Sequence, residues 1–250
     1  MPSRVIWQYW ETVGEKPAFV DGLLAIARKR AGLEIIVVTP ETLRRYLPDI
    51  PHEVFNISEI AHKADMIRTM LVMRHGGMWL DSDAIVLQNL DWIVDLLDDY
   101  EFVGFNDGGA LVGSRPWMRV NCFASHAGGA VISEWVRQQH AKFPRTSYQW
   151  DEIGTDLLHP ICLRNKGLVK VLPFEKIAPI TWDKVSQFMS RDMDPAPILR
   201  DCYIMMLSNQ SLKSRAPSLQ KMTVQNIASG DYLLSAVMRH AMQMSILSQK

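Results

Sequence analysis

The sequence predicts an α/β fold in which a mostly parallel sheet is covered by helices on both faces. Short β-rich segments alternate with segments of helical spacing up to residue 105, and this alternation is typical of parallel sheets. The 250 residues contain no linker, internal repeat or low-complexity segment. We therefore expect a single domain that spans residues 1–250.

The regular alternation lies in the first half of the chain. The run from Ile35 to Val38 predicts a buried strand. Ser58 is expected to cap a helix that ends at His75, where Gly76 and Gly77 stop it. Strands are expected at 5–10, 34–39, 78–80 and 102–105, and helices at 17–31, 40–47, 58–75 and 91–97.

The second half of the chain has a weaker pattern. Residues 128–142 and 231–247 predict helices, 168–172 and 203–207 predict strands, and 195–217 is expected to be irregular around the second strand. The apolar side of the last helix predicts packing on the sheet or in a homodimer. A helix at a membrane surface would carry more basic residues than Arg239 alone.

The composition excludes several classes of protein. Lys plus Arg and Asp plus Glu each number 27, so the net charge is zero, which argues against a nucleic-acid partner. Cys122, Cys162 and Cys202 are far apart in the sequence and indicate reduced thiols. We find neither a signal-peptide pattern nor an apolar run of the ~18–20 residues that span a bilayer. A cytoplasmic protein is expected, at most peripheral at the cytosolic face of the membrane.

Asp81 and Asp83 follow directly after the predicted strand at 78–80. Residues two apart on a strand share a face, so both carboxylates can approach one point. Ligands of parallel sheets lie outside the carboxyl ends of the strands. Mg²⁺ and Mn²⁺ take oxygen ligands, and Mg²⁺ usually shares its coordination sphere with substrate phosphates. The pair is a candidate cation site, and two solvated aspartates in a turn are the simpler alternative.

Asp65 and Arg68 lie three residues apart on the predicted helix at 58–75, so their side chains share one face. The simplest interpretation is a surface ion pair worth ~0.2–0.5 kcal/mol. In the functional interpretation, Asp65 accepts hydrogen bonds from sugar hydroxyls and Arg68 donates to the sugar or to a diphosphate. The planar guanidinium suits phosphate because it can bind two oxygens at once.

Trp7 and Trp10 fall on opposite faces of the first predicted strand, because side chains alternate along a strand. One ring is therefore expected in the core. The other could offer a flat face to a nucleotide base, an interaction worth ~1–3 kcal/mol per base.

The block Asp65-x-x-Arg68 … Gly76-Gly77-x-Trp79-x-Asp81-x-Asp83 resembles the DXD sugar-binding region of the family 32 glycosyltransferases. That group includes capsular polysaccharide synthesis proteins and yeast-type α-1,6-mannosyltransferases, and the large glucosylating toxins share the block. Residues 5–10 are similar to the first strand of the family. Trp7 stands where His is common, and Trp10 matches the Trp that stacks on the donor base.

Weaker similarities follow at Asn121 and in the Gly154-Thr155 loop, which is Gly-Pro in many relatives. Asn209 stands near the C-terminal loop that supplies a metal or phosphate contact in relatives, but the His or Trp often found there is missing. The resemblance implies a substrate-binding set of Trp7, Trp10, Asp65, Arg68, Gly77, Asn121, Gly154, Thr155 and Asn209.

The resemblance further implies a GT-A-like nucleotide-binding fold and a retaining hexosyltransferase. Such an enzyme moves a hexose from a UDP- or GDP-linked donor to a glycan acceptor, for example capsule, the O-antigen of lipopolysaccharide or a lipid-linked oligosaccharide. Asp83 and Asp81 would hold Mn²⁺ or Mg²⁺, which neutralises the leaving diphosphate. Arg68 would join these two aspartates in catalysis.

Other functions remain open at this point. A phosphatase of the haloacid dehalogenase kind also has an apolar strand and Asp-x-Asp, with Asp81 as nucleophile and Asp83 as acid/base. Against it, Ile85 stands where that motif has Thr or Val, and no Gly-Asp-x-x-x-Asp follows. A glycosidase would need neither the metal nor Arg68. A non-catalytic sugar-nucleotide-binding protein would show no turnover.

Overall fold

The computed structural model describes residues 2–12, 16–108 and 117–243. The chain forms two compact units, and each unit is assembled from three separate segments. Unit 1 comprises Met1–Val13, Leu33–Asp81 and Asp91–Leu172, and unit 2 comprises Gly14–Gly32, Ser82–Leu90 and Pro173–Lys250. One boundary thus falls inside Asp-x-Asp, after Asp81. The single domain expected from the sequence stays a prediction.

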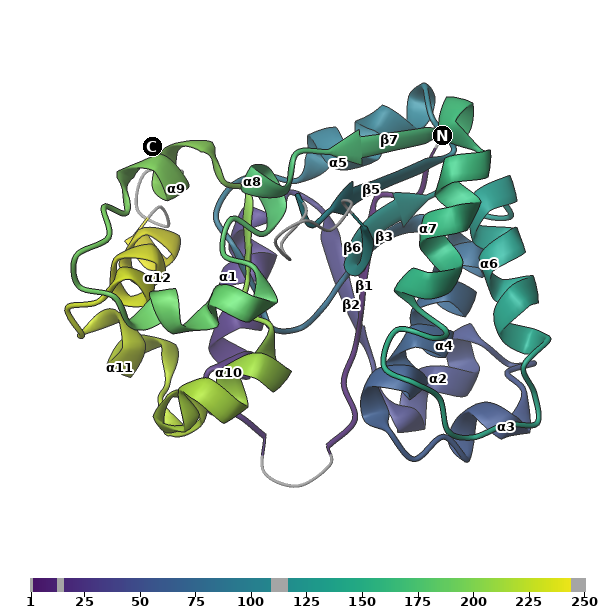
Figure 1. Cartoon of the computed structure of the whole chain (residues 1–250), viewed down its shortest axis with the longest axis horizontal. Coiled ribbons are helices and arrows are strands. Elements are labelled where there is room, and N and C mark those ends of the chain that lie inside the picture. The colour runs from purple at the N-terminus through teal and green to yellow at the C-terminus, as the bar shows by residue number, and fades with distance from the viewer. Residues whose placement is uncertain (1, 13–15, 109–116, 244–250) are drawn as a thin grey trace. The chain divides into compact units, whose positions relative to one another are not determined.

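Unit 1 is built on a six-stranded sheet with the strand order β2-β1-β3-β6-β5-β7 (Figure 1). Its strands are β1 (Val5–Tyr9), β2 (Glu34–Val38), β3 (Gly77–Leu80), β5 (Phe102–Asn106), β6 (Met118–Ser125) and β7 (Val169–Leu172). β6 runs antiparallel to β3 and β5, and the other neighbouring pairs are parallel. The mainly parallel sheet predicted from the sequence is therefore confirmed.

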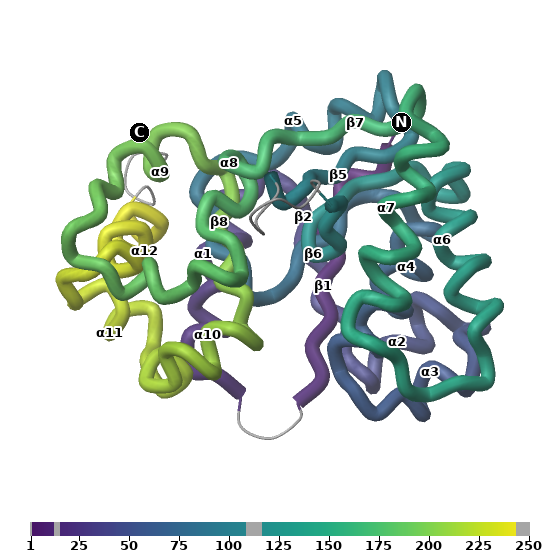
Figure 2. The backbone as a smooth tube through the Cα atoms, in the orientation of Figure 1, coloured from purple at the N-terminus to yellow at the C-terminus, as the bar shows by residue number. Residues whose placement is uncertain are grey.

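Three helices, α4 (Ile60–His75), α6 (Ala130–His140) and α7 (Thr155–Arg164), lie side by side against this sheet (Figures 1 and 2). The apolar side chains of α4 and the strands form one buried cluster that includes Ile67, Leu71 and Trp79. Shorter helices of the same unit are α2 (Pro40–Tyr46), α3 (His52–Phe55) and α5 (Asp91–Asp95).

Two glycines turn the chain from α4 into β3. Gly76 has φ 68° and Gly77 has φ 94°, values that favour glycine. A Cβ on Gly77 would lie 2.7 Å from the carbonyl oxygen of Val5, so β3 can approach β1 only with glycine there. The two strands pair in parallel, with Trp7 opposite Trp79. Their carboxyl ends therefore lie side by side, and antiparallel β6 begins at the same edge.

Unit 2 combines α1 (Val20–Arg30) with an antiparallel ladder of β4 (Ala84–Val86) and β8 (Ile204–Met206). The helices α11 (Val224–Ala228) and α12 (Leu233–Gln243) pack against each other (Figure 2). Further helices of this unit are α8 (Phe174–Ile177), α9 (Ala196–Asp201) and α10 (Asn209–Arg215). None of the helices in the described part of the chain has the length and apolarity needed to cross a bilayer.

The structure corrects several expectations about these elements. The residue that precedes α4 as its N-cap is Glu59, not Ser58, and its side chain makes no capping bond. Residues 195–217 contain α9 and α10 instead of irregular chain. The pattern also fails to predict β6 and α7. The predicted helix at 231–247 is present as α12, and residues 244–247 lie outside the described part.

Candidate active site

Arg68 connects two carboxylates in the interior of unit 1. Its Nη2 lies 3.3 Å from Asp65 Oδ1 and 3.5 Å from Asp81 Oδ1. Its Nη1 donates to the Val120 carbonyl on β6 at 2.8 Å. The side chains of Arg68 and Asp65 are only 6% and 9% exposed. The pair is therefore buried, which rules out the simple surface ion pair considered from the sequence.

Trp79 and Asn121 hold Asp81 at the carboxyl end of β3. Trp79 Nε1 donates to Asp81 Oδ1 at 2.7 Å, which is possible because residues two apart on a strand share a face. The Arg68 guanidinium lies 5.2 Å from the centroid of the Trp79 ring, within cation–π range. The Asp81 backbone N–H donates to the Asn121 carbonyl at 2.9 Å. Trp79 is part of the sequence motif, but the motif alone does not predict this role for its indole N–H.

The electrostatics of this cluster follow from its burial. Removal from water raises the pKa of Asp65 to about 7, the charges of Asp81 and Asp151 act in the same direction, and Arg68 opposes them. Burial also raises the pKa of Asp81, against Arg68 and the Trp79 N–H. One guanidinium thus serves two partly desolvated carboxylates. Such a cluster favours a ligand that brings hydrogen-bond donors or another cation.

Gly154 and Thr155, which the resemblance singled out, lie where α7 begins beside Asp65. A Cβ on Gly154 would lie 3.3 Å from Asp65 Oδ2, so the loop packs tightly on this carboxylate. Gln139 of α6 donates from Nε2 to the carbonyls of Asp65 and Ile153, at 3.1 and 2.8 Å. Thr155 is buried. The helices α4, α6 and α7 are thereby tied together around Asp65.

Trp10 lies just past the end of β1, at the edge of the sheet that carries Asp81. Its backbone N–H donates to the Val38 carbonyl at 2.9 Å, which continues the β1–β2 ladder, and its side chain is half-buried. The parallel register of β1 and β3 places Trp10 and Asp81 at the same edge of the sheet. The structure thus leaves Trp10 as the candidate platform for a base.

Two predicted substrate contacts have structural roles instead. Trp7 is 3% exposed in the core, and its Nε1 donates to the Gly76 carbonyl at 2.9 Å. Its ring therefore has no face left for a ligand. Gly77 begins β3 and Asp81 follows its end, so the two occupy opposite ends of this strand. Gly77 serves the close approach of β3 to β1.

Asp83 and Asn209 meet in unit 2. Asp83 Oδ2 accepts the backbone N–H of Asn209, the first residue of α10, at 2.6 Å. The Leu207 N–H donates to the Asp83 carbonyl at 3.1 Å. Ser208 turns the chain with φ 51°. Asn209 is thereby brought to Asp83 through its backbone, while its side-chain oxygen accepts from Gln220 at 2.9 Å.

Asp81 and Asp83 carry carboxylate oxygens, the ligand type that Mg²⁺ and Mn²⁺ prefer. Within the described residues, no three His, Cys, Asp or Glu side chains gather as metal ligands. Asp81 retains 28% exposure, and Asp83 follows two residues later. Mg²⁺ is commonly held by one or two carboxylates together with water and phosphate. These residues would therefore form an open metal site and not one closed by protein ligands alone.

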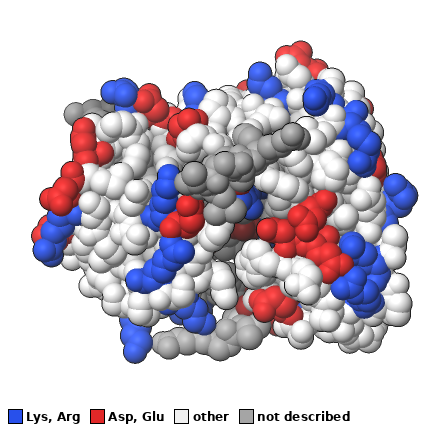
Figure 3. Space-filling view, viewed as in Figure 1, with Lys and Arg blue, Asp and Glu red and all other residues white. Residues whose placement is uncertain are grey.

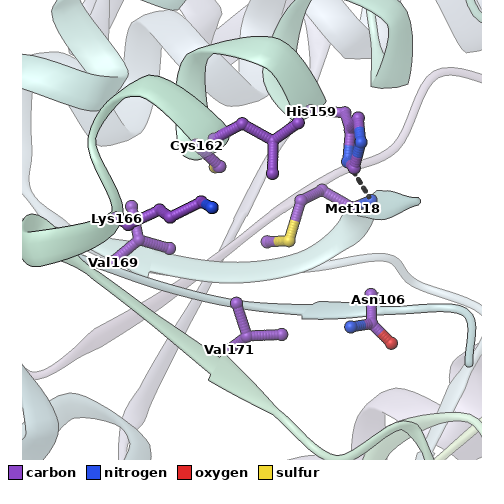
Figure 4. Close-up of a pocket in the computed structure, with 8 residues that line it drawn as sticks. Asn106, Met118, His159, Cys162, Lys166, Val169 and Val171 are labelled. Atoms are coloured by element: carbon purple, nitrogen blue, oxygen red, sulfur yellow. Dashed lines mark hydrogen bonds between the residues drawn. The ribbon is translucent and has the colours of Figure 1, made fainter. Parts of the chain in front are cut away.

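A cavity of about 260 Å³ lies between α7 and the strands β5, β6 and β7 (Figure 4). His159 accepts the backbone N–H of Met118 at its wall, at 3.3 Å. The cavity is lined by Asn106, Met118, His159, Cys162, Leu163, Lys166, Val169 and Val171. None of these residues belongs to the set predicted from the sequence.

Comparison with solved structures shows the fold. A glycosyltransferase involved in the glycosylation of the major capsid of PBCV-1 matches with a TM-score of 0.52 and 12% identity, over 86% of this chain and 98% of that one. The glycosyltransferase GlyE of Streptococcus pneumoniae TIGR4 matches with a TM-score of 0.52 and 12% identity. That match covers 97% of this chain but 61% of GlyE, less than two thirds of its length. The PaToxG glycosyltransferase matches with a TM-score of 0.50 and 11% identity, over 66% and 70%.

The family follows from the sequence itself. No curated protein matches this sequence. The family model described as capsular polysaccharide synthesis protein matches residues 1–144, more than half of the 250 residues. The matched segment contains Asp65, Arg68 and both residues of the aspartate pair. The chain therefore belongs to the capsular polysaccharide synthesis protein family and has the fold of GT-A-like glycosyltransferases.

Proposed function

We propose that this protein is a retaining, divalent-metal-dependent hexosyltransferase that uses a UDP- or GDP-linked donor and a glycan acceptor. The family and the fold are those of glycosyltransferases. The observation that carries the finer proposal is the cluster that the buried pair Asp65 and Arg68 forms with the partly exposed Asp81, where β1 and β3 end. The fold and family favour this function over the phosphatase and the glycosidase.

In this proposal, the cluster binds the hexose of the donor. The carboxylates of Asp65 and Asp81 accept hydrogen bonds from sugar hydroxyls, and Arg68 donates to the sugar or the diphosphate. Asn121 supports the same location, because its buried Oδ1 has no hydrogen-bond partner among the described residues. A buried acceptor of this kind calls for a partner, and a donor hydroxyl would supply it. Trp10 would cover the base.

Asp81 and Asp83 would hold Mn²⁺ or Mg²⁺. When bound, the cation supplies Lewis-acid neutralisation of the diphosphate leaving group. The assignment of both residues rests on their adjacency in the sequence. The Asn209 N–H orients the Asp83 carboxylate, as outer partners of metal ligands usually do. The glycan acceptor, action at the cytosolic face of a membrane and a homodimer stay predictions.

A thermal-shift screen tests the donor and the metal together. UDP, GDP and their hexose derivatives are added with and without Mn²⁺, since a ligand that binds the native state raises stability by RT ln(1 + [L]/Kd). We expect one nucleotide sugar to raise Tm, and more so with Mn²⁺. Asp83→Ala should lose the effect of Mn²⁺ and the turnover of the donor. Asp192→Asn, an exposed substitution, is the control.

Activity assays on the native protein and on Asp83→Ala distinguish the transferase from the alternative functions. Undiminished transfer by Asp83→Ala in excess EDTA would contradict the metal role. Release of phosphate from p-nitrophenyl phosphate, without turnover of any nucleotide sugar, would support the phosphatase instead. Binding of nucleotide sugars without any turnover would indicate a non-catalytic protein. NMR of the product, which reports the anomeric configuration, tests retention.

A further inference from the structure

Trp150 is 57% exposed, more than any other large hydrophobic residue that the structure describes. An indole is a large apolar surface that proteins normally bury or use in binding. Trp150 lies in the loop at 141–154, which leads from α6 to the start of α7. The position of this ring in a protein that acts on glycans calls for an explanation.

The loop around Trp150 is held in place by ionic hydrogen bonds. Arg145 binds both carboxylate oxygens of Glu152, at 2.6 and 3.0 Å, and Lys142 binds one of them at 3.0 Å. The Gln149 N–H donates to Glu152 at 3.0 Å. These contacts, Arg145 above all, lower the pKa of Glu152 to about 2. The ring is therefore presented by a preorganised loop, which reduces the entropy cost of binding.

Beneath Trp150 lies a histidine that lacks polar partners. The His62 ring is 6.2 Å from the Trp150 ring and meets the Tyr148 ring edge-on at 5.8 Å. His62 is 4% exposed, and neither ring nitrogen has a hydrogen-bond partner among the described residues. Buried polar groups without partners are costly and rare. A ligand hydroxyl beside Trp150 would give this imidazole a partner.

The same loop leads from Trp150 to the carboxylate of Asp65. His62 precedes Asp65 by three residues on α4, which puts them on one face, about 4.5 Å apart along the axis. Asp151 is near enough to raise the pKa of Asp65, and Gly154 packs on Asp65 Oδ2. His62, whose ring contacts Trp150, therefore lies about one helical turn from Asp65, the proposed contact of the donor hexose.

We infer that Trp150, with Asp151 and His62, forms the subsite for the acceptor sugar. One face of a pyranose ring presents C–H groups, which would stack on the indole, and its hydroxyls would donate to Asp151. The charge around Asp151 favours a neutral sugar over a phosphate, because the two carboxylates of Asp107 and Asp156 lie near it against the single guanidinium of Arg119. Figure 3 shows Asp and Glu side chains gathered on the face in view. The inference rests on the proposed function.

The test separates the acceptor from the donor. With the donor found in the thermal-shift screen, transfer to methyl glycosides of glucose, galactose, mannose and N-acetylglucosamine is measured beside hydrolysis of the donor by water. Trp150→Ala should raise the acceptor KM by roughly tenfold, as expected for lost stacking, while the donor KM in hydrolysis moves less than twofold. Trp150→Phe should recover most of the loss, because it keeps a flat face.

Two further variants serve as a control for Trp150→Ala and as a second test of the subsite. Leu163→Ala removes another exposed side chain, 51% exposed and roughly 12 Å along α7 from its start, and should leave the acceptor KM unchanged. Asp151→Asn keeps the shape of the side chain and should raise the acceptor KM at least threefold. An unchanged acceptor KM in Trp150→Ala would overturn the inference. An equal rise in the donor KM would do the same, because the ring would then belong to the donor.

Failure of the proposed function gives a different result. Saturation-transfer NMR of the same methyl glycosides, without donor, measures the subsite alone. Binding that is lost in Trp150→Ala, in a protein that turns over no nucleotide sugar, would support the subsite and reject the transferase. Donor turnover by the native protein, combined with equal glycoside binding by Trp150→Ala, would reject the subsite and leave the transferase standing.

Discussion

Arg68 reaches Asp65, Asp81 and the Val120 carbonyl because a guanidinium offers several donors in one plane. A lysine ammonium keeps the charge but not this geometry. The charge balance of the cluster therefore survives an Arg68→Lys substitution, whereas the contacts that span α4, β3 and β6 do not. The substitution therefore distinguishes the contribution of the positive charge from that of the guanidinium geometry.

For Arg68→Lys we expect the donor Kd to rise at least tenfold. The lost hydrogen bonds should also destabilise the fold by about 1–2 kcal/mol, which lowers Tm by roughly 2–8 °C in a protein of this size. Calorimetric titration of the donor and a melting curve measure both effects. Arg28→Lys, on the exposed side of α1, is the matched control. Unchanged donor binding would reduce Arg68 to a structural ion-pair partner.

Asp65 predicts a pH dependence of stability with a definite sign. The folded pKa is about 7, against ~3.9 in an unfolded chain, so the folded chain binds more protons between these values. Stability therefore falls as the pH rises from about 4 to about 7. Asp65→Asn cannot ionise, so its Tm should rise relative to that of the native protein as the pH increases from about 4 to about 7. Parallel Tm curves for the two proteins would contradict the raised pKa.

At the scale of elements, the tryptophan inside β1 and the one just past its end have different expected roles. Trp7→Ala should lower stability by ~3–5 kcal/mol, as for other truncated core aromatics. Trp10→Ala should instead weaken nucleotide binding by ~1–3 kcal/mol, and Trp10→Phe should recover much of it. Urea unfolding and titration with UDP or GDP measure the two effects. If Trp7→Ala instead weakens nucleotide binding and Trp10→Ala lowers the stability, Trp7 is the residue that contacts the base and Trp10 is the core residue.

The elements that could be predicted are those whose signals are local. The apolar runs of β1, β2 and β3, and the glycines after α4, appear within a few residues of sequence. β6 could not be predicted because Arg119 and Asn121 interrupt its apolar pattern at the end that faces the candidate site. α7 could not be predicted because it contains Pro160, and a proline in the interior of a segment normally argues against a helix.

The residues of the candidate site also fall into those that the sequence predicts and those that it does not. Asp65, Arg68 and Asp81 could be predicted because they stand in one short block that a helix and a strand bring together. Trp150 and Asp151 could not, because their relation to His62 and Asp65 depends on packing across some 90 residues of chain. A loop held by Arg145 and Glu152 leaves no periodic pattern in the sequence.

At the scale of the whole molecule, all three cysteines are buried and unpaired. Burial raises the pKa of Cys162 and Cys202 to about 12 and that of Cys122 in the same direction, so the thiols stay protonated and unreactive. We expect the native protein to react with less than one equivalent of DTNB in the first minutes. The protein unfolded in guanidinium chloride should react with three. Fast native reaction would show that a thiol is accessible.

The segments of the two units alternate along the chain, and this limits how either unit can be exchanged between related proteins. The chain leaves unit 1 after Val13, Asp81 and Leu172, and returns to it at Leu33 and Asp91. Recombination that exchanges one continuous stretch of gene between relatives can therefore transplant neither unit whole without segments of the other. An engineered chimera would need several simultaneous junctions to carry one unit intact.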